Sequence, residues 1–391
     1  MLIVPITEQQ IRAALQDGNA RTVLHELTQR GRGGDNLFLT RNALIDRRFV
    51  FGRSELLARM GSALGRGEQI LITGSRKLGK TSFLNILRQN LSEWPVAHLD
   101  LQRYDRNDSR WVEHLLDEIV AAYDRWGKAR FGDWPGEPEV VSDGRTLERA
   151  LLRRREWHGE RENPTQLVVI LDELERLIPR DGERDMARAF IRAAGALRAL
   201  AQGQERFLSI IAADLRPTAN RLNDLGGVGT NPLFRFFQEL PLPPLTSAAT
   251  QDMLQTLGGM MGIGSIDRAF EREIVLLSGG HPYLARTMAG AAAACRHDPG
   301  RLTLADLHEG LLNLEEDDEL GDFFRANFWK PLTDHEQSYL VAVATGRTPP
   351  LNRQVAAALK HQGLTDRHGI RMRAFRDWIV EALPADERVA Q

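Results

Sequence analysis

Short apolar runs alternate with longer amphipathic stretches through the middle of the chain, from Phe51 to the prolines Pro243 and Pro244. Each run has the length and the apolar content of a strand that is buried on both faces. Strands that alternate with helices in this way form a parallel sheet with crossover connections. The pattern therefore predicts an α/β core with five strands at Gln69–Thr73, Val96–Leu101, Leu167–Leu171, Phe207–Ala212 and Gln238–Leu242.

The connection between the second and third predicted strands is long for a crossover, at about sixty residues. It contains an amphipathic pattern near Trp111–Trp126, a loop rich in glycine and proline at Gly132–Pro138, and an arginine-rich pattern that starts at Leu147. Glutamates surround the three arginines at 153–155, which is typical of a solvated, salt-bridged helix. We expect two inserted helices here.

The strand pattern ends after Pro244, and the rest of the chain is predominantly helical. The pattern over Thr246–Phe328 predicts helices. The residues that follow have the predicted order helix, helix, hairpin and helix, which is typical of a winged helix. Its predicted elements are Asp334–Val343, Asn352–Gln362, Gly363–Ile370 and Ala374–Ala382.

The start of the chain shows two short helical patterns, at Glu8–Leu15 and Ala20–Thr28, and a glycine-rich segment at 31–34. The whole pattern predicts four parts. These are a small helical appendage at 1–48, the α/β core at 49–245, a helical domain at 246–328 and a winged-helix-like domain at 329–391.

Composition narrows the class of protein. A length of 391 residues favours several compact units. The formal charge of −2 gives no global field that would attract nucleic acid or an anionic membrane. Cys295 is the only cysteine, which excludes a disulfide framework and a cysteine-based zinc site. The start has no signal-peptide pattern, and no segment reaches the ~20 apolar residues of a membrane span. We expect a cytoplasmic protein without a membrane partner.

The strongest motif follows the first predicted strand. Residues 74–81 match G-x-x-x-x-G-K-[ST] in full and open a predicted helix, as a phosphate-binding loop (P-loop) does. Backbone N–H groups of such a loop point at phosphate oxygens, the lysine contacts the β and γ phosphates, and the threonine coordinates Mg²⁺. We therefore expect ATP or ADP with Mg²⁺ on Gly74, Ser75, Arg76, Lys77, Leu78, Gly79, Lys80, Thr81 and Ser82.

Two carboxylates follow the third predicted strand. Asp172 and Glu173 come directly after the apolar run Leu167–Leu171, at the strand end where open α/β sheets bind ligands. We expect Asp172 to hold Mg²⁺ together with Thr81, and Glu173 to polarise the attacking water as general base, with Lys80 as the second catalytic residue. A strand that ends in two acids is common by itself, so the functional interpretation of this pair depends on the P-loop that precedes it.

The chain resembles the STAND branch of the AAA+ ATPases, in which a nucleotide-binding core, a helical lid and a winged helix form a signalling switch. Beyond the two motifs above, the likeness rests on Phe51–Leu57, Asn231–Phe237 with Leu242–Thr246, and Gly279–Leu284, and it spans about residues 49–385. It implies that Phe51 and Arg53 flank the adenine and that His281 and Pro282 face the nucleotide from the lid. It also implies a γ-phosphate sensor after the fourth strand, at Asp214 or Arg216.

The resemblance implies an ATP-dependent switch that signals through a partner protein or by self-assembly, because the 48 residues before the core are too few for an effector domain. A DNA-binding AAA+ ATPase is the alternative, with the terminal module on phosphate through Arg371 and Arg373, near Arg367 and Arg376. The third reading is a structural subunit that binds ATP without useful hydrolysis.

Overall fold

The computed structural model describes residues 36–39, 42–108, 110–137, 139–159, 166–203 and 207–381. The helical patterns expected near Glu8 and Ala20 lie outside these residues. The chain divides into two compact units. We call Leu44–Pro243 the core unit, and we call the segment from Pro244 onward, with the residues that precede Leu44, the helical unit.

The core unit is built on a parallel sheet of five strands in the order β2-β3-β4-β1-β5. The apolar runs form these strands because both faces of the sheet are covered, so that every residue of β1, β3 and β4 is buried. All five predicted strands are confirmed, with ends that shift by at most a few residues. The strands are β1 (Ile70–Thr73), β2 (Val96–Asp100), β3 (Leu167–Asp172), β4 (Leu208–Asp214) and β5 (Gln238–Pro241).

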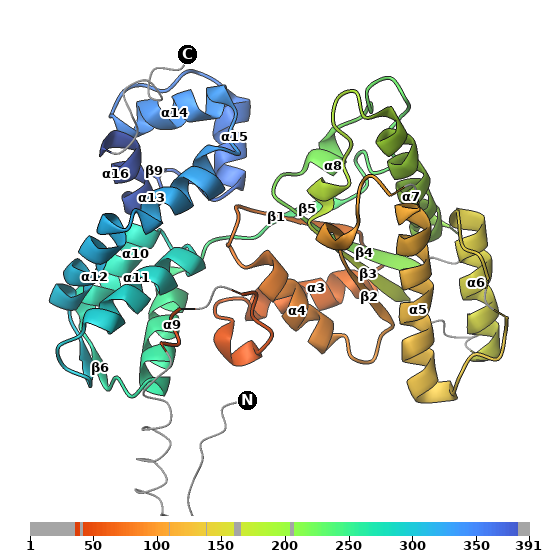
Figure 1. Ribbon diagram of the computed structural model, residues 1–391, viewed down its shortest axis with the longest axis horizontal. Helices are drawn as coiled ribbons and strands as arrows, with labels where there is room; N and C mark the ends of the chain where they lie inside the picture. The colour runs from red at the N-terminus through yellow and green to blue at the C-terminus, as the bar shows by residue number, and fades with distance from the viewer. Residues whose placement is uncertain are drawn as a thin grey trace, which may run out of the picture. The chain divides into compact units, whose positions relative to one another are not determined.

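Helices cover both faces of this sheet (Figure 1). On one face, α3 (Ser54–Gly65) and α4 (Lys80–Asn90) pack in one apolar cluster with β1 and β3 residues. On the other face lie α5 (Trp111–Phe131) and α7 (Arg184–Gln202), and the inserted helix α6 (Gly144–Trp157) packs against both. The two helices expected between the second and third strands are therefore present. The short α8 (Thr218–Arg221) follows β4.

The helical unit begins with four helices and a short parallel strand pair, β6 (Ser265–Ile266) and β7 (Arg301–Leu302). The helices α11 and α12 make its most extensive contact. Phe38 is fully buried in this unit. Arg286 of α11 donates hydrogen bonds to the carbonyls of Leu37 and Phe38, which ties this segment to the helix. The helices are α9 (Ser247–Met260), α10 (Arg268–Ser278), α11 (Pro282–Cys295) and α12 (Leu304–Glu316).

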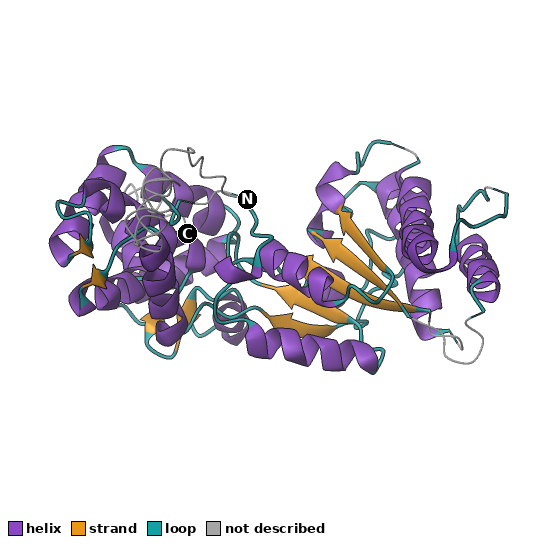
Figure 2. Cartoon of the chain, turned by 90° about the horizontal axis from the view of Figure 1, so that it is seen from below, coloured by secondary structure: helices purple, strands orange, loops and turns teal. Residues whose placement is uncertain are grey.

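The C-terminal part has the predicted order of helix, helix, hairpin and helix. It contains α14 (Asp334–Ala344), α15 (Arg353–His361), the hairpin strands β8 (Thr365–Asp366) and β9 (Gly369–Ile370), and α16 (Arg373–Glu381). Helix α16 packs against α10 and α14. Figure 2 shows how strongly helix predominates outside the sheet of the core unit. None of the helices in the described part of the chain is long and apolar enough to span a membrane.

An aromatic cluster joins the two parts of the helical unit. Phe324 ends α13 (Glu319–Phe324) and Phe328 lies in the π-helical turn Arg325–Trp329, and their rings contact that of Phe375 in α16 at centroid distances of 5.3 and 5.2 Å. The boundary expected at 328/329 falls inside this turn, and both sides belong to one compact unit. The division into a lid and a separate winged-helix domain stays a prediction.

Candidate functional site

The P-loop connects the C-terminal end of β1 to the start of α4. Gly79 precedes α4 with φ +96°, and Lys77 also has a positive φ, of +59°. A left-handed residue at the helix start turns the loop so that the first N–H groups of α4, which have no partner within the helix, face outward from its end. This backbone geometry binds anions, and the positive end of the helix dipole favours a negative charge at the same place.

Lys80 is the first residue of α4, and its side chain reaches back to the loop. Its ammonium donates hydrogen bonds to the carbonyl oxygens of Gly74 and Ser75, with Nζ···O distances of 2.8 and 3.1 Å. Burial lowers the pKa of Lys80, and four neighbouring carboxylates, Glu175, Asp214, Asp172 and Glu173, act in the opposite direction. The side chain is thus a partly desolvated cation held over the loop.

Asp172 and Thr81 meet at the end of the sheet. Asp172 is the last residue of β3, its side chain is buried, and it forms a side-chain hydrogen bond with Thr81. Burial raises the pKa of Asp172, and the hydrogen bond with Thr81 acts against this rise. A hydroxyl and a carboxylate are the hard oxygen ligands that Mg²⁺ prefers, so the paired side chains suit this ion.

Glu173 is held by a neighbour. It has φ +60°, which is uncommon for a residue with a side chain, and its backbone N–H donates to Oδ1 of Asp172 at 3.1 Å. Its carboxylate forms an ion pair with Arg176, with an Nε···Oε2 distance of 3.2 Å. Residues held in sparsely populated backbone regions concentrate at functional sites, where the surrounding structure imposes them.

A second pair of carboxyl groups lies close to Lys80. Asp214 ends β4 with 1% of its surface exposed, and burial, together with the nearby charge of Glu175 in the 3-10 helix η3 (Leu174–Arg176), raises its pKa. The sequence singled out Asp214 as a sensor candidate but missed Glu175. An acid two residues beyond the expected pair gives no signal by itself, because only the pairing of β3 with β4 brings η3 to Asp214.

A polar cavity of about 650 Å³ adjoins this site. Thr81 and Asp172 line it on the side of the P-loop, together with Asn85 and Arg88 of α4. The end of β2, the start of α5 and the residues between them supply the rest of its wall, including Asp100, Arg103 and Glu118. Tyr104, also in this wall, donates a hydrogen bond to Glu118, with a distance of 2.5 Å. The cavity offers room for hydrated groups beside the two predicted Mg²⁺ ligands.

The segment before α3 contacts the P-loop and α4. Arg53 is 5% exposed, its Nη2 lies 3.5 Å from the carbonyl oxygen of Leu78, and burial lowers its pKa to about 10. Phe51 is partly buried. The hydroxyl of Ser82 accepts a hydrogen bond from the N–H of Leu44 at 2.9 Å. Adenine contacts of Phe51 and Arg53, and an α-phosphate contact of Ser82, stay predictions.

His281 and Pro282 start α11 in the helical unit. His281 is 2% exposed, its Nδ1 accepts a hydrogen bond from the N–H of Leu284 at 3.4 Å, and its ring lies edge-on to that of Phe328. Pro282 occupies the first helical turn, where its missing N–H costs nothing. Both residues therefore have a structural role within this unit, and their expected role toward a nucleotide stays a prediction.

The arginines around the C-terminal hairpin have partners within their own unit. Arg373 forms an ion pair with Glu273 of α10, and Arg371 lies 3.7 Å from Asp366. Arg376 pairs with Asp377 at 2.5 Å, and Nε of Arg367 donates to the ring of His368 at 2.9 Å. Arg373 thus links α16 to α10, whereas the other three arginines contact residues close to them in the chain.

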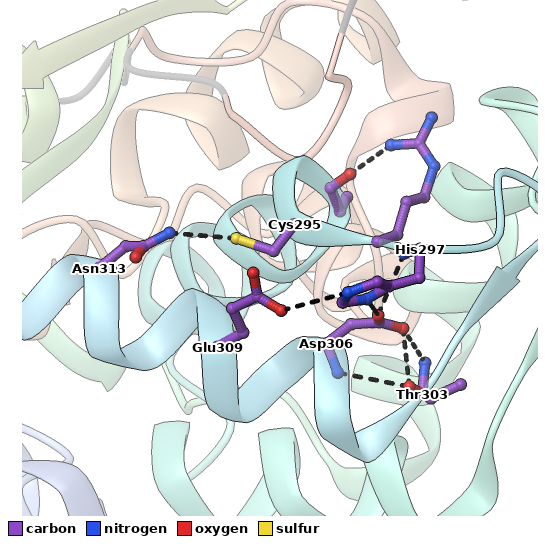
Figure 3. Close-up of polar contacts among 8 residues, drawn as sticks. Cys295, His297, Thr303, Asp306, Glu309 and Asn313 are labelled. Carbon is purple, nitrogen blue, oxygen red and sulfur yellow. Dashed lines mark hydrogen bonds and ion pairs between the residues drawn. The ribbon is translucent and has the colours of Figure 1, made fainter.

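Cys295 belongs to a polar cluster at the end of α11 (Figure 3). Nδ2 of Asn313 donates to its sulfur at 3.1 Å, and burial raises the pKa of the thiol, which makes it a weak nucleophile. Asp306 caps α12 by accepting from Thr303, and its Oδ1 lies 3.3 Å from Nδ1 of His297. Within the described ranges no group of three or more histidine, cysteine or acidic side chains is arranged to hold a metal. The contacts of this cluster cap the start of α12 and link α12 to the end of α11.

No family model matches the chain, and no curated protein resembles it in sequence. The chain is similar in structure to the Walker-type ATPase PABY2304 of Pyrococcus abyssi, with a TM-score of 0.57, 17% identity, and coverage of 88% of this chain and 99% of that one. It is also similar to the RuvB Holliday junction branch migration motor of Thermotoga maritima, with a TM-score of 0.43, 14% identity, and coverage of 88% and 99%. The first likeness shows that the core unit has the fold of a P-loop NTPase.

Proposed function

We propose that this chain is an ATPase of the P-loop class that binds ATP with Mg²⁺, hydrolyses it slowly and uses the cycle as a molecular switch of the STAND or AAA+ type. The observation that supports this most directly is the meeting of Lys80, Thr81 and Asp172 at the C-terminal end of a parallel sheet with the strand order β2-β3-β4-β1-β5. A glycine turn that matched the motif by accident would not bring a lysine, a hydroxyl and a buried carboxylate together.

The phosphates would lie against the loop and the first turn of α4. Lys80 now donates to two neutral carbonyls, and ionised phosphate oxygens are stronger acceptors, so the ammonium would exchange its partners when nucleotide binds. Thr81 and Asp172 would hold Mg²⁺, which neutralises charge on the phosphates when it is bound.

Glu173 is the proposed general base for the attacking water. Its carboxylate is ion-paired with Arg176, and an oxygen that already accepts a hydrogen bond from a guanidinium is not free to orient a water. Glu173 therefore has to leave Arg176 before it acts, which makes slow turnover the expected behaviour of the chain alone. A partner that draws Arg176 away would accelerate hydrolysis.

The helical unit supports the role of a switch. The cluster around Phe324 and Phe375 joins its two parts, so α9 to α16 would reorient as one body when the nucleotide changes. Reorientation or self-assembly would then carry the signal to a protein partner.

One observation favours the alternative, a DNA-handling ATPase. Helix α15 exposes Arg353 and Lys360 and contains no acidic residue, and Arg347 and Arg367 are exposed on either side of it. A basic helix next to a hairpin is the surface that a winged helix lays on DNA. The arginines at 371 and 373 argue against this reading, because both have acidic partners.

The test is steady-state ATP hydrolysis with and without duplex DNA, together with mass measurement in ATP. The variants are Lys80→Ala and Glu173→Gln, with the exposed Glu137→Gln as a matched control. We expect weak hydrolysis that DNA does not stimulate, a loss of roughly a hundredfold or more in both site variants, and no change in the control. Glu173→Gln should still bind ATP and should accumulate the assembled form.

Two results would contradict the proposal. Failure of the wild type to bind ATP, or hydrolysis by Lys80→Ala at the rate of the wild type, would refute the proposed nucleotide function. Stimulation by DNA that falls on charge reversal at Arg353 and Lys360, and that weakens steeply with salt, would establish the alternative.

A further inference from the structure

The chain passes between its two compact units twice, once before Leu44 and once after Pro243. The second passage is short, because the N–H of Leu242 donates within the core unit, the N–H of Leu245 donates within the helical unit, and only two prolines stand between them. The first passage is the segment 36–45, which we call the strap and of which residues 36–39 and 42–45 are described. A second covalent connection restricts how far two units can reorient about the first.

The upstream end of the strap is bound within the helical unit. Phe38 is fully buried there. Arg286 of α11 donates to the carbonyl oxygens of Leu37 and Phe38 at 2.6 and 3.2 Å, and Nδ2 of Asn36 donates to the carbonyl oxygen of Gly290 at 2.7 Å. This end is therefore anchored to α11 by a buried ring and by hydrogen bonds in both directions.

The downstream end of the strap is bound by α4 of the core unit. Ser82 Oγ accepts from the N–H of Leu44 at 2.9 Å, Nδ2 of Asn85 donates to the carbonyl oxygen of Leu44 at 3.2 Å, and Nε2 of Gln89 donates to that of Ile45. The three side chains of α4 are three and four residues apart, so they lie on one face of the helix. Ile45 is 67% exposed, so hydrogen bonds to the backbone, rather than burial of this side chain, hold the strap here.

Ser82 also belongs to the predicted nucleotide site. It follows Thr81 in the first turn of α4, where the phosphates would lie. A hydroxyl has one O–H donor and two lone pairs, and Leu44 uses a lone pair, so the O–H can donate to a phosphate oxygen at the same time. A hydroxyl that donates to an anion is polarised and becomes a stronger acceptor. A bond to phosphate and the bond from Leu44 therefore strengthen each other through one oxygen.

We propose that the strap responds to nucleotide: a phosphate on the hydroxyl of Ser82 tightens the hold of α4 on the strap, and the docked strap restricts the reorientation of the helical unit. Asn85 and Gln89 are positioning residues that keep Leu44 against Ser82. When nucleotide leaves, the bonds of the strap weaken and the free chain between the two units lengthens. The proposal rests on the proposed nucleotide binding, and it adds the segment through which the site acts on the helical unit.

The first experiment measures the affinity of the full chain for ADP with Mg²⁺ by calorimetry. Because coupling is reciprocal, a weaker strap has to lower nucleotide affinity, and Asn85→Ala should weaken binding about three- to tenfold, the worth of one hydrogen bond. Asn90→Ala changes the same residue type at the exposed end of the same helix and should bind as the wild type. In a chain that carries Ser82→Ala, Asn85→Ala should have no further effect.

The second experiment measures exchange of the Leu44 amide hydrogen by NMR, which reports the opening of its bond to Ser82. Without nucleotide, Asn85→Ala should speed this exchange about three- to tenfold, and Asn90→Ala should not change it. Saturating ADP should slow the exchange by a similar factor in the wild type and should have no effect in Ser82→Ala.

The third experiment tests the restriction of the helical unit. Spin labels are attached at Arg188→Cys in α7 and Glu315→Cys in α12, two exposed positions, in a chain that carries Cys295→Ser. ADP should narrow the distribution of distances between the labels. A strap lengthened by about six glycine and serine residues after Ala43 should lose this narrowing, while ADP affinity stays within about twofold because a longer loop adds little closure entropy.

The outcomes separate the claims. An equal loss of affinity from Asn85→Ala with and without the Ser82 hydroxyl would assign Asn85 a direct or purely structural role and overturn the coupling. Faster exchange of Leu44 in ADP would overturn its sign. Narrowing that persists with the lengthened strap would overturn the restriction. In all three cases the wild type still binds ADP, so the proposed function stands, whereas a wild type that binds no nucleotide would overturn both.

Discussion

The glycine turn of the P-loop and the glycine turn before α11 have different reasons for their positive φ. Gly79 of the P-loop has φ +96°, and a Cβ atom there would meet nothing within 4 Å. Gly280, before α11, has φ +79°, and a Cβ atom there would overlap the carbonyl oxygen of Leu245. The backbone of Leu245 also donates to Gly280, with an N···O distance of 2.8 Å. The first turn is open as a ligand requires, and the second is filled by the chain itself.

The neighbouring Gly279 strengthens this contrast. It has φ +56°, and a Cβ atom there would lie 2.7 Å from the carbonyl oxygen of Arg371. The turn at 279–280 is therefore a crossing point of three segments, the one that enters the helical unit, the start of α11 and the end of the C-terminal hairpin. Glycine before a helix indicates an unusual backbone, and only the surroundings decide whether a ligand or another segment occupies the space it leaves.

The largest effect on stability is expected for Gly280→Ala. The new methyl group has to displace the backbone of Leu245 and adopt a left-handed conformation, which together should cost roughly 2 to 5 kcal/mol of the helical unit's stability. Hydrogen exchange of the amides in α11 measures this loss locally. The control is Gly259→Ala in α9, where a Cβ atom would meet nothing and alanine should stabilise by up to about 1 kcal/mol.

Similar exchange rates in Gly280→Ala and Gly259→Ala would break the contrast between the two turns. They would mean that the segment at Leu245 moves away at little cost, and the crossing point would then be a hinge rather than a fixed contact. A slowed exchange in the control and a much faster exchange in Gly280→Ala would sharpen the contrast.

A smaller effect on stability and a large effect on binding are expected for Gly79→Ala. The strain of a left-handed alanine should cost about 1 to 2 kcal/mol, since no atom has to be displaced. The first N–H groups of α4 would turn away from the anion, and we expect at least a tenfold loss of nucleotide affinity, measured by calorimetry with ADP. Unchanged affinity at equal stability loss would show that the open turn is not a ligand site.

Much of the core unit was predictable, because its signals are local. Buried apolar runs gave all five strands, and the P-loop and Asp172 follow from residues that are adjacent in sequence or end a strand. The structure brings Asp172 and Thr81 together, and their binding of Mg²⁺ stays a prediction. Predictions of this kind need only the rule that the carboxyl ends of parallel strands share one edge.

The features that the sequence did not predict depend on contacts between distant segments. Glu175 belongs to the site only because it lies near Asp214, whose pKa its charge raises. Asp214 is one long helix and one strand further along the chain, so no local pattern indicates this pairing. The boundary expected at 328/329 is crossed by ring contacts between Phe328 and Phe375, which no local pattern indicates. The partner of Arg373 likewise comes from a distant element, α10, which the sequence pattern did not indicate.

The smallest effect is expected for the ion pair between Arg373 and Glu273, with side chains that are 37% and 23% exposed. A double-mutant cycle of Arg373→Ala and Glu273→Ala should give a coupling of about 0.2 to 1 kcal/mol, because water screens a pair at such exposure. Nucleotide affinity should not change. If Arg373 instead serves DNA, its removal should leave stability unchanged, weaken DNA binding and lower the slope of log affinity against log salt by about one. That result would make the end of the hairpin a ligand surface, and Arg373 would then do more than hold α16 against α10.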